Sequence, residues 1–191
     1  MSQKKFLNSI DKIIKGCVAG NIKYQEMLYK QLSGKMFAVC LRYSKDYTEA
    51  EDILQEGFIK VFEKINQFKF KGSFEGWVRR IIVNTALDKY RKQNILQTVD
   101  DISKYSEDFN YDDVISKITS NDLLKFIHEL TPKYKVVFIS YAIEGYSHKE
   151  ISDMLGISVG TSKSNLSRAR QILQDKINKY YTDEGKIKLL K

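Results

Sequence analysis

Aromatic and basic side chains alternate in one short segment of the chain, Phe68-Lys-Phe-Lys-Gly-Ser-Phe74. Aromatic rings can stack on unpaired bases while lysines neutralise phosphates, so this alternation is typical of a surface that binds single-stranded nucleic acid. A polar stripe follows at helical spacing and shares one helix face: Trp77, Arg80, Asn84, Asp88 and Arg91. The segment and the stripe together predict a nucleic-acid surface. For any one aromatic taken alone, a place in the hydrophobic core is an equally good interpretation.

A second polar surface is predicted from residues 147–171. Ser147 and Glu150 have capping-box spacing, Gly156 permits a left-handed turn, and Ser158 can cap the next helix. Two short helices joined by such a turn make a helix-turn-helix, and small Ser152 lets them approach. The outer face of the second helix carries Lys163, Ser164, Ser167, Arg168 and Gln171. These residue types suit base edges and phosphates in a major groove. The alternative is a structural helical hairpin with a solvated polar face.

An acidic face is predicted on a third element, the amphipathic helix of residues 48–65. Thr48 and Glu51 have capping-box spacing at its start. The outward face carries Glu49, Asp52, Glu56 and Glu63, with Gln55 beside them. On a basic protein such a face should repel DNA and can dock a basic protein surface, although many acidic faces are simply solvated. Gly57 lies inside this helix at a cost of about 1 kcal/mol relative to alanine, which predicts a close helix contact there.

The sequence contains few features that are typical of an enzyme. It contains no glycine-rich phosphate loop, no HExxH pattern and no GxSxG elbow. Its two cysteines, Cys17 and Cys40, have no CxxC spacing, and its two histidines form no cluster. We therefore expect no catalytic residues, no metal site, no cofactor and no small-molecule substrate.

Composition and periodicity indicate the fold that positions these surfaces. One proline and 10 glycines among 191 residues favour an all-α fold, and the net charge of +8 favours an anionic partner. Helical periodicity predicts helices near residues 21–44, 48–65, 74–92, 123–130, 134–143, 147–155 and 158–180. Acidic residues are concentrated in residues 94–122, where only Val114–Ile118 could form a short helix. We expect two small helical domains, 1–93 and 123–191, joined by this acidic linker, with the helix-turn-helix and a short tail in the second. No membrane span or cleavable leader is evident, so we expect a cytoplasmic protein.

Three stretches in this order resemble the extracytoplasmic-function (ECF) sigma factors of bacterial RNA polymerase. DYTEAEDILQEGF (residues 46–58) is similar to the region-two helix that grips the polymerase clamp, and FEGWVRRIIVNTALDKYR (74–91) to the helix that engages the −10 element. EGYSHKEISDMLGISVGTSKSNLSRAR (144–170) resembles region four, which reads the −35 element. Three departures from the family pattern are Gly57, Ser162 and Asn165.

The resemblance implies a bacterial transcription initiation factor that binds core RNA polymerase and directs it to promoters, holding the −35 duplex and opening the −10 element. The residues it implies for polymerase binding are Asp52, Gln55 and Glu56. Those for the −10 element, with a base extruded into a pocket at the loop, are Phe68, Lys69, Lys71, Ser73, Trp77, Arg80, Asn84 and Arg91. Those for the −35 duplex are Lys163, Ser164, Ser167 and Arg168. It also implies an anti-sigma factor partner, commonly membrane-anchored. The alternative is a helix-turn-helix regulator that binds duplex DNA alone, with residues 1–93 as a sensing or dimerisation domain.

Overall fold

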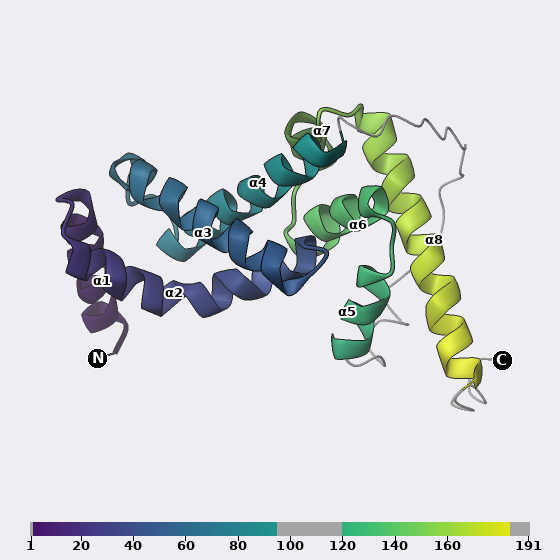
Figure 1. Ribbon diagram of the computed structural model, residues 1–191, viewed down its shortest axis with the longest axis horizontal. Helices are drawn as coiled ribbons and strands as arrows, with labels where there is room; N and C mark the ends of the chain where they lie inside the picture. The colour runs from purple at the N-terminus through teal and green to yellow at the C-terminus, as the bar shows by residue number, and fades with distance from the viewer. Residues whose placement is uncertain (1, 95–119, 184–191) are drawn as a thin grey trace. The chain divides into compact units, whose positions relative to one another are not determined.

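The computed structural model describes residues 2–94 and 120–183, and every regular element in these ranges is helical (Figure 1). The all-α prediction is thus confirmed. The chain forms two compact units, Met1–Lys92 and Gln93–Lys191. The short helix predicted at Val114–Ile118 lies outside the described residues. None of the helices in the described ranges combines the length and apolar composition that crossing a bilayer requires.

The N-terminal unit contains four α-helices and one short 3-10 turn. They are α1 (Ser2–Val18), α2 (Ile22–Tyr43), α3 (Tyr47–Lys64), η1 (Ile65–Gln67) and α4 (Phe74–Asn94). Helix α1 lies outside the helices predicted from the sequence. Ile13, Ile14 and Cys17 of α1 are buried, and α1 packs against α2 and η1. The first helix therefore completes the hydrophobic core of this unit.

The start of α3 differs from the prediction. Asp46, rather than Thr48, is the N-cap: its carboxylate accepts a hydrogen bond from the Glu49 backbone N–H at 2.8 Å. Glu49 in turn accepts the Lys45 backbone N–H at 2.7 Å and is buried. The predicted Thr48–Glu51 capping box is therefore wrong, and Glu49 belongs to the helix cap instead of the outward acidic face.

Gly57 marks a close approach of α3 and α4. A Cβ built on Gly57 would overlap the Ile82 Cδ1 methyl, and it would lie 3.6 Å from the Ile82 Cα. Both residues are buried. The predicted close contact is confirmed, and it fixes the distance between the acidic helix and the helix that carries the polar stripe.

Within residues 120–183, the described part of the C-terminal unit, there are five helical elements. They are α5 (Ser120–His128), α6 (Pro132–Phe138), the π-helical turn η3 (Ile139–Ile143), α7 (His148–Leu155) and α8 (Val159–Asp183). Helix α5 begins three residues earlier than predicted, inside the segment expected to be linker. Thr131 and Pro132 start α6 as predicted, although the Thr131 side chain makes no capping hydrogen bond.

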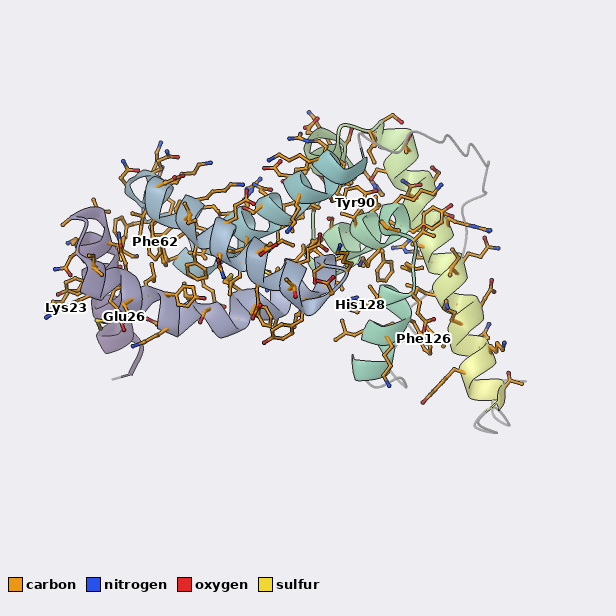
Figure 2. All side chains as sticks on the ribbon, in the orientation of Figure 1. Lys23, Glu26, Phe62, Tyr90, Phe126 and His128 are labelled. Carbon is orange, nitrogen blue, oxygen red and sulfur yellow. The ribbon has the colours of Figure 1, made fainter. Side chains whose placement is uncertain are left out.

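Helix α8 is the long element against which this unit packs. Phe126 of α5, labelled in Figure 2, meets Tyr180 of α8 edge to face, with ring centroids 5.6 Å apart. The face of α8 toward α6 and α7 is lined by buried Ser162, Leu166, Ala169, Leu173 and Ile177. Val159, the first residue of α8, is 41% exposed.

Candidate nucleic-acid interface

Two acidic side chains of α3, Asp52 and Glu56, form ion pairs within the N-terminal unit. Lys89 of α4 places its Nζ 3.2 Å from an Asp52 carboxylate oxygen, and Asp52 remains 64% exposed. Lys60 lies 2.8 Å from Glu56 and 3.9 Å from Asp88 of α4. Exposed ion pairs of this kind contribute about 0–1 kcal/mol each, so a partner can displace them easily.

A surface cavity of about 280 Å³ opens between α2 and α3, beside the acidic side chains. Tyr29, Phe37 and Tyr47 supply aromatic walls, and Gln55 and Glu51 supply polar edges. Phe37 and Tyr47 meet edge to face, with centroids 4.8 Å apart. The acidic face thus borders an aromatic recess that could receive an apolar side chain of a protein partner.

The loop before α4 divides its aromatics into inner and outer ones. The Phe68 ring is 8% exposed and packs against Phe74 at 5.0 Å and Trp77 at 5.7 Å between centroids. Phe70 rests on Phe68 at 5.1 Å yet is 51% exposed. Its φ of 55° lies in the left-handed region, where a phenylalanine is strained. The structure therefore places Phe68 in the core of this aromatic cluster, whereas Phe70, absent from the predicted site residues, presents its ring outward.

The cationic and amide groups expected at the −10 element lie in the loop and along α4. Lys69, Lys71 and Ser73 are exposed in the loop, and the Ser73 hydroxyl accepts the Gly76 backbone N–H at 3.3 Å. On α4, Arg80, Asn84 and Arg91 are exposed and Trp77 is half-buried. Arg91 is tied to Asp88 at 3.1 Å. An exposed aromatic with flanking cations can hold an unstacked base and its phosphates.

The helix-turn-helix prediction is confirmed in detail. Ser147 and Glu150 form a reciprocal capping box at the start of α7. Gly156 ends α7 with a φ of 69°, a conformation that glycine adopts without strain. The Ser152 hydroxyl donates to the Ile157 carbonyl at 2.6 Å across the turn, and the Thr161 backbone N–H donates to Ser158 Oγ at 2.9 Å.

The outer face of α8 carries the four residues expected at the duplex. Lys163 is exposed, and Ser164, Ser167 and Arg168 are partly exposed. Arg168 donates to the Gln171 side chain at 2.9 Å, and the Ser164 hydroxyl donates to the Thr161 carbonyl at 3.1 Å. All four residues lie within the first three turns of α8, the second helix of the motif. This is the helix that enters the major groove in proteins of this type.

One contact at this motif was not predicted. His148 Nδ1 lies 2.9 Å from the Oγ of buried Ser162, which joins the start of α7 to the start of α8. The only sequence signal was a small polar residue at a position that helical periodicity assigns to the core.

The two cysteines of the chain belong to the hydrophobic core. Cys17 and Cys40 are both buried and free, and burial raises the pKa of the Cys40 thiol to about 12. Residues 2–94 and 120–183 contain no group of three or more His, Cys, Asp or Glu side chains placed to hold a metal ion.

One helical unit carries an aromatic and basic loop, and the other carries a helix-turn-helix. This combination is typical of a DNA-binding protein that acts in transcription. Residues 28–95 match sigma-70 region 2, and residues 120–173 match sigma-70 region 4. The chain is 31% identical over 155 residues to the ECF RNA polymerase sigma factor SigW of Bacillus subtilis, covering 75% of this chain and 83% of SigW. It is also 31% identical over 162 residues to the ECF sigma factor SigE of Mycolicibacterium smegmatis, covering 82% of this chain and 62% of SigE.

The chain therefore belongs to the ECF RNA polymerase sigma factor family. It acts as a sigma factor, directing RNA polymerase to promoters through regions 2 and 4, and it is not an enzyme. The fold is similar to that of the sigma factor RpoE from Bartonella quintana, solved in complex with the anti-sigma factor NepR. That comparison has a TM-score of 0.50 and 20% identity, and covers 83% of this chain and 98% of RpoE.

Proposed function

We propose that the two units divide promoter recognition between them. Residues 1–93 bind core RNA polymerase and the −10 element, residues 94–122 link the units, and residues 123–191 bind the −35 duplex. Opening a strand requires stacking surfaces, whereas anchoring on a duplex requires groove and phosphate contacts. The exposed aromatic loop in one unit and the capped helix-turn-helix in the other support this division.

Polymerase binding in this proposal uses Asp52, Gln55 and Glu56 of α3. All three are exposed, and Gln55 also lines the aromatic recess between α2 and α3. A basic surface of polymerase would replace Lys89 and Lys60 as the partner of the two carboxylates. This exposed acidic face on a chain of net charge +8 is the observation that carries the proposal.

The −10 element would meet the loop and α4. Phe70 and Trp77 offer aromatic surface to an extruded base, with Phe68 supporting them from the core. The polar contacts would come from Lys69, Lys71, Ser73, Arg80, Asn84 and Arg91. In the C-terminal unit Lys163, Ser164, Ser167 and Arg168 would hold the −35 duplex, with arginine and lysine on phosphates or guanine edges.

Regulation and location follow from the same family. An anti-sigma factor, membrane-anchored in one common arrangement, would cover both units until a signal releases them. The RpoE structure with NepR supports a partner of this kind. Because its polymerase and promoters are there, the protein would act in the cytoplasm.

The test is copurification of the full chain with bacterial core RNA polymerase. Asp52→Arg and Glu56→Arg should each weaken binding by at least about thirtyfold, since reversing one charge of a desolvated pair costs roughly 2 kcal/mol or more. Glu63→Arg is the matched control, because Glu63 is an exposed carboxylate of the same helix outside the proposed site.

Two results would contradict the proposal. Equal loss for all three variants would indicate a general charge effect, and full retention of polymerase by Asp52→Arg and Glu56→Arg would remove α3 from the interface. Fluorescence of Trp77, the one tryptophan of the chain, reports whether each variant keeps its folded N-terminal unit.

A further inference from the structure

The His148 side chain connects the two helices of the helix-turn-helix at a point away from the turn. Its Nδ1 forms a hydrogen bond of 2.9 Å with the hydroxyl of Ser162, which is 0% exposed. His148 is the first residue of α7 and Ser162 the fourth of α8. A fully buried hydroxyl needs a partner, so loss of the imidazole would leave it unsatisfied at a free-energy cost.

The orientation of the His148 ring is also constrained by stacking. Tyr141 of η3 stacks on it, with ring centroids 4.5 Å apart and an interplanar angle of 22°. The Arg170 guanidinium of α8 lies 5.7 Å from the Tyr141 ring centroid. Stacking and hydrogen bonding together fix both the tilt and the position of the imidazole.

The charges around the ring favour its neutral form. The pKa of His148 is lowered by burial, and further by Lys163 and Arg170 of α8. The carboxylate in the same turn, Glu150, accepts the Ser147 backbone N–H at 2.9 Å as part of the capping box. At neutral pH the ring is therefore an uncharged partner for Ser162.

The position of Ser162 decides where the neighbouring side chains point. Successive residues on a helix are separated by about 100° of rotation, since a turn has 3.6 residues. Any rotation of α8 that moves Ser162 from its buried site swings Lys163 and Ser164 by the same angle. The Ser152 hydrogen bond to the Ile157 carbonyl holds the turn, and the His148–Ser162 bond is a second attachment that resists this rotation.

We propose that His148 is a positioning residue for recognition of duplex DNA: through Ser162 it fixes the rotation of α8, and with it the side chains that read the −35 element. This inference rests on the proposed role of α8 in binding the −35 duplex. It predicts that His148 affects sequence discrimination without touching a base.

The test uses the full chain bound to core RNA polymerase, and a duplex that the wild-type complex selects from a random-sequence pool. Binding to this duplex and to a shuffled duplex of the same composition is measured for His148→Ala, Ser162→Ala, the double variant and His148→Asn. His128→Asn is the matched control, because His128 is the second of the two histidines of the chain and lies on α5.

His148→Ala and Ser162→Ala should each weaken binding to the selected duplex about fivefold, the factor that corresponds to one net hydrogen bond. Binding to the shuffled duplex should not change, because phosphate contacts carry no sequence information. The double variant should lose no more than either single variant. His148→Asn should recover at least half of the loss on a logarithmic scale, since an amide can take the place of Nδ1, and His128→Asn should match wild type.

Unchanged discrimination in His148→Ala, equal losses on both duplexes, or additive losses in the double variant would each overturn the inference. If His148→Ala does not fold by circular dichroism, Ser162→Ala and His148→Asn decide the outcome. Failure of the proposed function gives a different result: the wild-type complex then selects no duplex from the pool, or does not form.

Discussion

Alanine at Gly57 tests the close contact between α3 and α4. The new methyl would overlap the Cδ1 of Ile82, a side chain that is fully buried and so has little space to move. Replacing glycine by alanine inside a helix stabilises it by about 1 kcal/mol, whereas overpacking a core costs about 1–3 kcal/mol. We expect Gly57→Ala to lower the free energy of unfolding by about 1 kcal/mol, the difference between these effects.

Ile82→Val removes the overlapping methyl and supplies the decisive comparison. Alone it should lower the free energy of unfolding by about 1 kcal/mol, as is usual for isoleucine to valine in a core. In the double variant the alanine methyl fills the space left by Cδ1, and the gain in helix propensity remains. The double variant should therefore fall within about 0.5 kcal/mol of wild type, instead of the roughly 2 kcal/mol loss that additivity gives.

Urea unfolding followed by tryptophan fluorescence measures the free energy of unfolding of the N-terminal unit, which contains both Gly57 and Ile82. Trp77 is the one tryptophan of the chain, and it packs against Phe68 and Phe74 in the N-terminal unit. Additive losses, or a Gly57→Ala variant more stable than wild type, would refute the contact as the reason for the glycine.

Three further predictions concern other parts of the molecule. Burial is the first cause that lowers the pKa of both His128, labelled in Figure 2, and His148 below the ordinary 6.5, so the unfolded chain takes up protons first as pH falls. The C-terminal unit should therefore lose stability as pH falls below about 6.5, and a His128→Asn, His148→Asn variant should lose less in thermal unfolding between pH 7.5 and 5. Phe70→Gly should keep or raise the stability of the N-terminal unit, because glycine relieves about 1 kcal/mol of strain at positive φ. The same variant should reduce promoter opening in a permanganate footprint, and unchanged opening would contradict a base contact by this ring. The thiol of Cys40, with its pKa of about 12, should react with a disulfide reagent at pH 8 only after unfolding, and fast labelling of the native chain would show that its site opens.

The sequence predicted most helices because their apolar residues recur at helical spacing and their ends carry capping residues. At the start of α3 two residue pairs, Thr48 with Glu51 and Asp46 with Glu49, each combine an N-cap residue type with a glutamate three residues later. Local pattern could not choose between them, because the choice depends on the burial of Glu49 in the folded unit. Helix α1 was missed although Ile13, Ile14 and Cys17 have helical spacing.

Which candidate residues share a face could be predicted where a regular helix carries them, and less readily in loops. The polar face of α8 follows from periodicity, so its residues lie together as expected. In the loop before α4, the choice between Phe68 and Phe70 as the outward ring depends on a single positive φ, which no periodic pattern encodes. The His148–Ser162 bond spans the turn of the motif and could be seen only after the two helices had been placed.

The ion pairs of Asp52 and Glu56 also determine what docking on the acidic face can gain. Lys89 and Lys60 act as built-in counterions for Asp52 and Glu56. A partner that takes over either carboxylate must first separate such a pair, so the net Coulombic gain is a difference between two similar pairs. Electrostatics on this face would therefore disfavour acidic partner surfaces more than it would raise the affinity for a basic one. Most of the affinity would come from shape complementarity and apolar contact. In the proposed complex, docking on Asp52 would also release Lys89 of α4, and the local surface would become more cationic when a promoter strand has to be captured.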